Sequence, residues 1–269
     1  MISLVILTQD PISEDLQYDL DRQTYRDFEV IMATEDGAAN ALNLALAKAK
    51  GEIFVRIDSD VRLTNTWLEE IVKGFENKYD FSPGAVNYVE CIAGVTGPTF
   101  VPIYLRNERD SIRVAQDPPW WLRWLWGNDP YAPAKIYNCG SVSYGSNFIE
   151  HIEDKEYEID HLEGTNWAMR TGLIRCVGGF DPKFDGVWEW LDDDVCFKIK
   201  KLGYEIKYNP KAVVFHMLGK GKHFNDRFEG WGRIKNWLRF HFRHSKFHYK
   251  KVIWLCLMTG YVIKKQLFQ

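Results

Sequence analysis

The chain has 269 residues, of which 46% are hydrophobic and 26% are charged, and its formal net charge is −3. This apolar content excludes a chain that is mainly disordered, and five widely spaced cysteines without a CxxC pair exclude a disulfide scaffold. The first residues lack the basic region and the apolar core of a secretory signal, so we expect a cytoplasmic protein.

Charge is distributed unevenly along the chain. Residues 220–269 contain twelve Lys and Arg but two acidic residues, whereas the whole chain has a net charge of −3. The C-terminal end is therefore basic and the preceding part is acidic. This asymmetry predicts that the end of the chain meets an anionic partner.

The first third of the chain alternates short apolar runs with helix-compatible segments. Strands are predicted at residues 2–7, 28–33 and 53–57, because these runs are apolar and rich in β-branched residues, as buried parallel strands are. Helices are predicted at residues 38–50 and after Thr64, which we expect to cap a helix with apolar residues three and four apart. The alternation predicts a parallel sheet with right-handed crossovers.

The rest of the chain is less regular. We predict a strand within residues 86–95, a loop at 118–133, helices at 171–177 and 189–202, and strands at 204–208 and 213–215. The loop holds four tryptophans between residues 120 and 126. We interpret it as a lid that stacks on sugars, as a wedge at a membrane interface, or as a segment packed in the core, since so many large rings are costly to leave in water.

Two carboxylates follow the third predicted strand. Asp58 and Asp60 lie one residue apart at its carboxyl end, which is where ligands bind in open α/β sheets. Such a pair suits a hard cation, Mg²⁺ or Mn²⁺, which can hold a diphosphate. A solvated turn is the alternative interpretation.

Several segments, in the right order over about residues 1–219, together resemble family 2 glycosyltransferases. The segments are RQTYRDFEVI (22–31), ALN (41–43), GEIF (51–54), IDSD (57–60), GTNWAMR (164–170), VGGFD (177–181), DDDVCFKIKKLGY (192–204) and VVFH (213–216). The resemblance implies an α/β GT-A fold, which is Rossmann-like with a mostly parallel central sheet flanked by helices. It also implies an inverting, metal-dependent transfer of a sugar from a nucleotide-sugar.

The resemblance further implies roles for single residues. Asp60 and His216 are expected to bind the cation, with Asp58 beside them or nearer the ribose. Asp192 stands in the place of the catalytic base, and Asp193 is the second candidate, with Asp194 one residue further on. The expected nucleoside-binding residues are Thr8, Glu35, Asp36 and Asn43, and the expected acceptor-binding residues are Asn166 and Trp190.

Two departures from the family pattern leave an alternative open. Residues 34–37 run almost directly into the next helix, so the nucleoside pocket is expected to be small, and Leu191 stands where the family has Glu. A catalytically silent nucleotide- or glycan-binding protein of the same fold is therefore the alternative. A nucleotidyltransferase is disfavoured, because residues 8–20 offer no loop rich in Gly and Arg.

We divide the chain into a GT-A domain at residues 1–225 and a basic, aromatic helical tail at 226–269. Within the domain, residues 1–100 are predicted to bind the nucleotide-sugar and residues 101–225 the acceptor. The expected donor is a UDP- or GDP-sugar. The expected acceptor is a glycan or a polyprenyl phosphate.

The tail predicts a membrane contact. Trp231, Ile234 and Leu238 recur at helical spacing among basic residues, and the apolar run at residues 252–263 is too short to cross a bilayer. Basic flanks and aromatic residues favour an orientation in the interface of an anionic membrane, on its inner face, with Trp231, Ile234, Trp254 and Leu255 inserted. Docking on the body or on a second subunit is the alternative, and no nucleic-acid partner is expected because no such motif is present.

Overall fold

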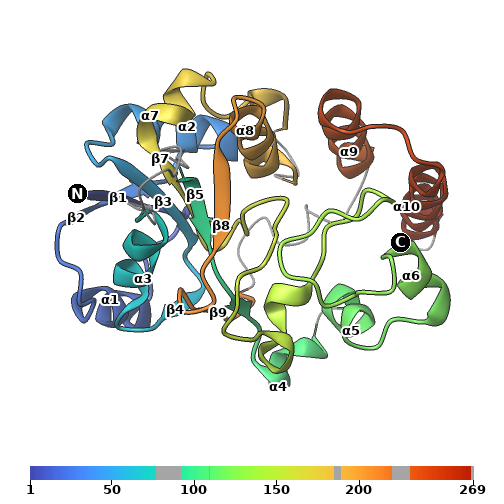
Figure 1. Ribbon diagram of the computed structural model, residues 1–269, viewed down its shortest axis with the longest axis horizontal. Coiled ribbons are helices and arrows are strands. Elements are labelled where there is room, and N and C mark those ends of the chain that lie inside the picture. Colours follow the sequence, from blue (N-terminus) through green and yellow to red (C-terminus); the bar gives the residue numbers. More distant parts are fainter. Residues whose placement is uncertain (77–91, 109, 185–188, 220–230, 268–269) are drawn as a thin grey trace, which may run out of the picture.

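The computed structural model describes residues 1–76, 92–108, 110–184, 189–219 and 231–267 (Figure 1). Its central sheet has six strands in the order β2-β1-β3-β7-β5-β8. They are β1 (Ile2–Leu7), β2 (Phe28–Ala33), β3 (Ile53–Asp58), β5 (Ile92–Thr96), β7 (Trp167–Arg170) and β8 (Glu205–Tyr208). Strands β1, β2 and β3 pair in parallel, as do β5 and β8, whereas β7 is antiparallel to both neighbours. The predicted mostly parallel sheet is confirmed.

Two of the sheet's inner strands differ from the sequence-based expectation. The sequence predicts no strand at β7, which has four residues and ends directly at a helix. Of the strand predicted at residues 86–95, residues 86–91 lie outside the described residues, and β5 begins at Ile92 and runs on to Thr96.

A second, three-stranded sheet lies beside the carboxyl end of β3. It consists of β4 (Val61–Leu63), β9 (Val214–His216) and β6 (Thr99–Phe100), in the order β4-β9-β6. Val61 pairs with His216 in an antiparallel register. This pairing brings a residue from late in the chain next to the turn that follows β3.

Helices cover both faces of the central sheet (Figure 1). Ile2, Leu4 and Ile6 of β1 belong to the core shared with α1 (Glu14–Asp21) and α3 (Trp67–Gly74). Val5 belongs to the opposite core, which includes residues of α2 (Ala38–Lys48), α7 (Thr171–Cys176) and α8 (Leu191–Lys200). The predicted cap at Thr64 is wrong: Thr66 precedes α3, and Thr64 contributes its backbone oxygen, which accepts from the N–H of Trp67 at 3.1 Å.

The region between the two sheets and the C-terminus is built from short helices. These are α4 (Ile103–Arg106), α5 (Asp110–Gln116) and α6 (Trp120–Leu125), with 3-10 turns η1 (Gly145–Asn147), η2 (Ile149–His151) and η3 (Pro182–Phe184). The prediction of a loop throughout residues 118–133 is wrong, because α6 begins after Pro119 and buries Leu122 and Leu125, three residues apart. Trp126 is buried as well, while Trp120 is 80% exposed.

The basic tail forms two helices, α9 (Trp231–His244) and α10 (Tyr249–Leu267). The amphipathic helix predicted at the start of the tail is confirmed as α9, but its apolar face packs on the protein: Ile234, Trp237 and Phe240 are buried. The expectation that Ile234 inserts into lipid is therefore wrong. Within the described residues, no helix is long and apolar enough to span a bilayer.

Candidate active site

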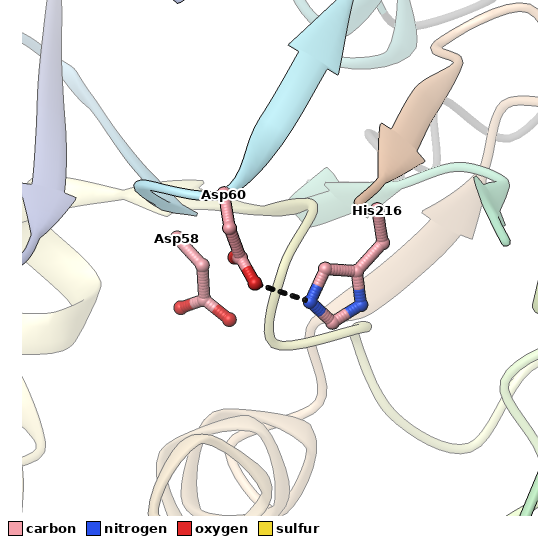
Figure 2. Close-up of side chains that lie close together, drawn as sticks. All are labelled: Asp58, Asp60 and His216. Atoms are coloured by element: carbon pink, nitrogen blue, oxygen red, sulfur yellow. Dashed lines mark ion pairs between the residues drawn. The ribbon is translucent and has the colours of Figure 1, made fainter. Parts of the chain in front are cut away.

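The predicted metal ligands lie together at the carboxyl end of β3 (Figure 2). Asp58 is the last residue of β3, Asp60 lies in the following turn, and the register of β4 with β9 places His216 beside them. One ligand atom from each of the three residues lies within 4.8 Å of the others, and Nε2 of His216 is 3.4 Å from Oδ2 of Asp60. We call Asp58, Asp60 and His216 the Asp–His cluster. Two carboxylates and an imidazole that are all partly exposed fit a divalent cation.

The backbone after β9 holds Asp60 in this cluster. The N–H of Gly219 donates to Oδ2 of Asp60 at 2.6 Å, and the N–H of Met217 donates to the backbone oxygen of Asp60 at 2.9 Å. A Cβ at position 219 would lie 2.8 Å from Cβ of Asp60, so only glycine permits this approach. Burial acts to raise the pKa of Asp60, but His216 and the Gly219 N–H hold it below its usual value.

Arg56, which the sequence analysis does not single out, connects this cluster to α8. It lies on β3 two residues before Asp58, is buried, and pairs with Oδ1 of Asp58 at 3.2 Å and with Oδ2 of Asp192. Burial disfavours its charge, but the carboxylates of Asp192 and Asp58 raise the pKa of Arg56 above its ordinary value. A charged residue inside the apolar run IFVRID is the signal that identifies it, since a buried charge is rarely retained without a partner.

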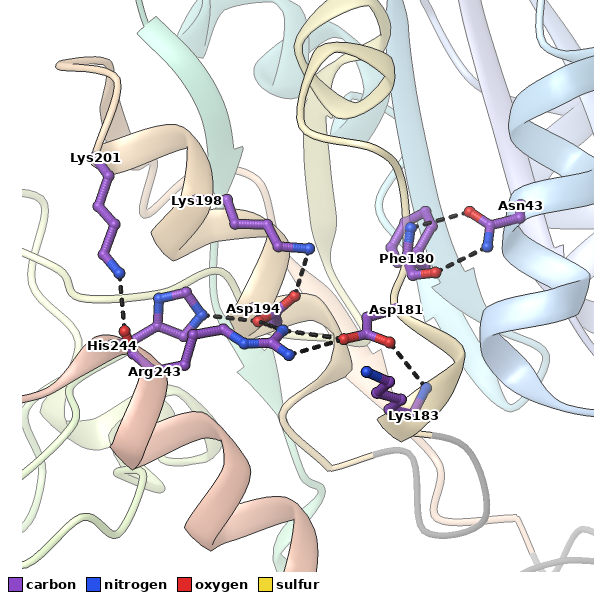
Figure 3. A network of polar contacts seen from close by, with 9 residues as sticks. All are labelled: Asn43, Phe180, Asp181, Lys183, Asp194, Lys198, Lys201, Arg243 and His244. Carbon is purple, nitrogen blue, oxygen red and sulfur yellow. Dashed lines mark hydrogen bonds and ion pairs between the residues drawn. The ribbon is translucent and has the colours of Figure 1, made fainter.

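The three consecutive acids at the start of α8 have different surroundings. Asp192 and Asp193 line a large cavity, and Oδ1 of Asp193 lies 3.1 Å from Nδ1 of His161. Asp194 is not part of the cavity lining and is fully buried in contact with Lys198, Arg243 and His244 (Figure 3). Through its contacts with Arg243 and His244, Asp194 attaches α9 to α8. The residues left to act on a substrate are Asp192 and Asp193.

Asp192 combines burial with an available oxygen. Its Oδ2 faces Arg56, while its buried Oδ1 has no hydrogen-bond partner among the residues that the structure describes. Burial raises the pKa of Asp192, and the nearby Arg56 opposes this rise. The Cα of Gly164 lies so close that a Cβ there would be 3.1 Å from Oδ2 of Asp192. A carboxylate fixed in this way is suited to accept a proton at Oδ1.

His161 and Glu163 are two further residues of this site that the sequence analysis does not single out. Burial opposes the charge of His161, but the Asp193 carboxylate raises the pKa of the imidazole to about 9. Burial raises the pKa of Glu163, which accepts a hydrogen bond from Ser146 at 2.8 Å. Both lie just before the GTNWAMR segment, in a stretch without periodicity, so position alone gives no signal for them.

The cavity has a volume of about 710 Å³, within the range of small-molecule sites. It extends from the start of α8 to α6 and α10, and Trp190 forms part of its lining. The ring of Trp190 also stacks on Phe240 of α9, with the two ring centres 4.5 Å apart. Parts of the tail therefore form one wall of the cavity.

Three predicted nucleoside residues gather at the carboxyl ends of β1 and β2. Thr8 follows β1, and its hydroxyl donates to the backbone oxygen of Asp10 at 2.9 Å. Glu35 and Asp36 follow β2, and the side chain of Gln9 donates to Oδ1 of Asp36 at 2.9 Å. The two loops are thereby joined at the same edge of the sheet as Asp58.

Two predicted ligand contacts are corrected. The Asn43 amide donates to the backbone oxygen of Phe180 at 2.8 Å and accepts from its N–H at 2.9 Å (Figure 3). The Asn166 amide is fully buried, donates to the backbone oxygens of Pro98 and Ala212, and accepts from Nε1 of Trp67. Both amides hold segments of the fold together, so neither is available to the nucleoside or to the acceptor.

Comparisons with known proteins agree with this fold. Residues 8–110 match the sequence model of glycosyl transferase family 2. The mannosyltransferase PcManGT from Pyrobaculum calidifontis, solved with GDP-Man and Mn²⁺, is similar with 17% identity and a TM-score of 0.51, over 97% of this chain and 69% of that one. GalNAc-T7, solved with UDP, GalNAc and Mn²⁺, is similar with 13% identity and a TM-score of 0.56, over 89% of this chain and 47% of that one.

This chain thus spans about half of the length of GalNAc-T7. A search of curated proteins found no match. The arrangement of strands and helices is the GT-A fold of glycosyltransferases, which confirms the predicted fold class. This likeness in fold accompanies the match of residues 8–110, less than half of the chain, to glycosyl transferase family 2.

Proposed function

We propose that the protein is an inverting glycosyltransferase that uses Mn²⁺ or Mg²⁺ to transfer a sugar from a UDP- or GDP-sugar to an acceptor hydroxyl or phosphate. The observation that carries this proposal is the Asp–His cluster, whose ligand atoms lie within 4.8 Å of one another and which Arg56 joins to Asp192. Both structurally similar glycosyltransferases were solved with Mn²⁺ and with GDP-Man or UDP, which supports the choice of cation and donor.

Each part of the site has a role in this reaction. Asp58, Asp60 and His216 would hold the cation, which when bound neutralises the charge of the diphosphate. Thr8, Glu35 and Asp36 would contact the nucleoside, because they lie at the same edge of the sheet as Asp58. In this assignment residues 1–100 bind the donor and residues 101–225 the acceptor, and the tail at 226–269 completes the acceptor side.

Asp192 is the proposed base. Its Oδ1 has no partner among the described residues, it lines the cavity, and burial raises the pKa of Asp192, which makes its carboxylate a stronger proton acceptor. Asp193 is the second candidate, but His161 already occupies its carboxylate. The ion pair with Arg56 fixes the orientation of Asp192 toward the metal side of the site.

We also propose that the protein lies on an anionic membrane through α6 and α10. Trp120, Trp124, Val252 and Leu257 are exposed on these two helices. Nζ of Lys250 lies 4.3 Å from the centre of the Trp124 ring, so α6 and α10 present basic and aromatic groups side by side (Figure 1). Aromatic, aliphatic and basic side chains in this combination suit the headgroup region of an anionic bilayer.

Metal-dependent nucleotide binding tests the enzymatic proposal. We expect UDP or GDP with Mn²⁺ to raise the melting temperature of the protein, because ligands of the folded state stabilise it by mass action. Asp60→Ala removes a ligand oxygen and should abolish the Mn²⁺-dependent part of this rise. Glu158→Ala is the matched control, because Glu158 is an acid whose side chain is 93% exposed and which lies outside the cluster. An unchanged rise in Asp60→Ala would contradict the proposal.

A further inference from the structure

We propose that the acceptor is an amphiphilic glycoside, in which a neutral sugar presents its hydroxyl to Asp192 and an apolar aglycone lies along α6 and α10. This inference rests on the proposed function, since it names the substrate class of the same site. It is drawn from the cavity of about 710 Å³, whose lining differs from one end to the other.

The end of the cavity at α8 is rich in oxygen acceptors. Asp192, Asp193 and Glu163 line it, and we call these three residues the polar end. Two cations already contact these acids: Arg56 is bound to Asp192, and His161 is paired with Asp193 at 3.1 Å. Carboxylate oxygens accept hydrogen bonds from hydroxyl groups, which sugars supply in number.

A phosphate at the polar end would be disfavoured by charge. Arg233 and Lys265 also line the cavity, but Nε of Arg233 lies 3.0 Å from the Glu189 carboxylate, Lys265 belongs to α10 rather than to the polar end, and Arg56 is bound to Asp192 and Asp58. A phosphate monoester would place its negative charge beside Asp192 and Asp193 in a buried site, where like charges repel strongly. The polar end therefore selects a neutral hydroxyl and rejects a polyprenyl phosphate.

The lining supplied by α6, by Trp126 directly after it, and by α9 and α10 is mostly apolar, although Arg233, Tyr261 and Lys265 also belong to it. We call its apolar residues the apolar wall: Trp121, Trp126, Trp237, Trp254, Leu257, Met258 and Val262. The Trp237 ring is fixed by a hydrogen bond of 2.8 Å from its Nε1 to the backbone oxygen of Gly140. Fixed aromatic faces stack on sugar rings and pack against aliphatic chains. Water is unfavourable against such an apolar wall, so an apolar aglycone would bind there in its place.

The apolar wall continues onto the outer surface. Trp121 and Leu257 line the cavity and are also 41% and 42% exposed, so the cavity opens between α6 and α10. The exposed residues Trp120 and Val252 lie on the same two helices, at the face proposed to meet a membrane. An aliphatic chain that leaves the cavity here would enter the bilayer without crossing water.

The transfer itself balances with the residues described. The acceptor oxygen forms a bond to the anomeric carbon of the donor, and the bond from that carbon to the diphosphate breaks. The electron pair of the broken bond leaves with the nucleoside diphosphate. The proton of the acceptor hydroxyl moves to Oδ1 of Asp192.

The full chain with Mn²⁺ and a panel of UDP- and GDP-sugars tests this inference. The acceptors are octyl β-glucoside and octyl β-galactoside below their micelle concentrations, the matching methyl glycosides, and octyl phosphate, with products detected by mass spectrometry. We expect octyl glycosides to be used with kcat/KM at least about tenfold above methyl glycosides, because several methylenes become buried. Octyl phosphate should give no product.

Leu257→Asp and Ile253→Asp separate the cavity from the surface around it. Both residues are exposed positions on α10, but Leu257 lines the cavity and Ile253 is not part of its lining. Leu257→Asp should remove the preference for octyl over methyl glycosides, and Ile253→Asp should retain it. Ile253→Asp, which lies outside the lining, should also keep the hydrolysis of the donor in the absence of acceptor.

Three results would overturn the inference: equal use of octyl and methyl glycosides, preferred use of octyl phosphate, or donor hydrolysis with no transfer to any glycoside. In each case the proposed function would stand, because the donor would still react. Failure of the proposed function is a different result, namely no Mn²⁺-dependent nucleotide binding and no turnover of any donor.

Discussion

The Asp–His cluster and the cavity lie on either side of Arg56, and they are built from different kinds of structure. The cluster consists of a strand end, a turn and a short paired strand, with its key oxygen held by the backbone N–H of Gly219. The cavity is enclosed by helices far apart in the sequence, α6, α8, α9 and α10, which are joined by buried charges and stacked rings. The Asp–His cluster thus depends on local geometry, while the cavity depends on the docking of the tail.

This difference separates the expected effects of mutations. Changes at the cluster should alter chemistry and leave the fold intact, and a change at the base should act on chemistry more than on stability. Changes at the contacts of α9 should alter stability first, and acceptor use as a consequence. The predictions that follow test this separation, from the largest expected effect to the smallest.

Asp192→Asn should have the largest effect on catalysis. The substitution retains the size of the side chain but removes the basic oxygen, so transfer should fall by about 10²–10⁴-fold, the range for general base catalysis. Binding of the donor with Mn²⁺ should change little, because the Asp–His cluster is intact. Steady-state kinetics and nucleotide binding, measured on the same variant, provide the two readouts.

Asp193→Asn is the control for that assignment. It should reduce transfer less, since Asp193 is paired with His161. If Asp193→Asn were inactive and Asp192→Asn active, Asp193 would be the base. Activity in neither variant together with normal donor hydrolysis would also contradict the assignment to Asp192 alone.

Asp194→Asn should destabilise the protein by about 3 kcal/mol or more, because it leaves buried cations without their counter-charge. Lys198, Arg243 and His244 all contact this carboxylate, at 2.8, 2.7 and 2.7 Å. Denaturant unfolding measures the loss. Asp181→Asn is the milder control, because Asp181 contacts Arg243 at 3.0 Å from a more exposed position. Equal losses in both variants would show that Asp194 does not anchor α9.

Acid should act on the same contact. Burial acts to raise the pKa of Asp194, but the hydrogen bonds and charges of His244, Lys198 and Arg243 lower this pKa to about 2. A carboxylate whose folded pKa is lowered contributes stability above its unfolded pKa and loses it as pH falls toward the folded value. The contribution should therefore be present above about pH 4 and disappear toward pH 2. In Asp194→Asn this part of the acid dependence should be absent.

The pair of His161 and Asp193 should respond at the opposite end of the pH range. The pKa of the His161 imidazole, about 9, lies above that of an exposed histidine. The ion pair therefore contributes its full stability below about pH 6.5, and this contribution is lost as the pH rises through 9. We expect the melting temperature of the native chain to fall between pH 7 and pH 10. This fall should be larger than the fall in Asp193→Asn by at least about 2 °C. Equal slopes would contradict a charged His161. Glu163 also faces His161 and adds to the same attraction.

The strands around the Asp–His cluster and the position of its two carboxylates could be predicted from the sequence, because these signals are local. The three buried runs gave β1, β2 and β3, and the spacing of Asp58 and Asp60 placed both carboxylates at the end of β3. Asn43 and Asn166 were wrong as ligands, since an amide beside a tight turn can satisfy the backbone instead. Their hydrogen bonds cross 137 and 46 residues of sequence, which no local pattern reveals.

The region around the cavity could be predicted only in part. The sequence shows the helical spacing of apolar residues in α9, but it does not show which residues of α8 they contact. In the sequence, an apolar face that packs on the protein therefore looks the same as one that binds lipid. The pairing of Arg56 with Asp192 and of His161 with Asp193 also joins segments far apart in the chain. Long-range charge pairing decides this region, and it is the information that composition and spacing lack.

The smallest expected effect concerns the membrane. The full chain should co-sediment with vesicles rich in anionic lipid at low salt and partly dissociate as salt rises, because the attraction of Lys250 and its neighbours is Coulombic. Trp120→Ser should weaken binding by about fivefold, since Trp120 is 80% exposed on α6 and would lose its insertion into the interface. Tyr18→Ser is the control, because Tyr18 is an exposed aromatic residue on α1, which covers another part of the molecule.

Because the apolar face of α9 is packed on the protein, removal of residues 231–269 should lower the melting temperature as well as vesicle binding. No co-sedimentation at low salt, or equal losses in Trp120→Ser and Tyr18→Ser, would contradict a membrane face at α6 and α10.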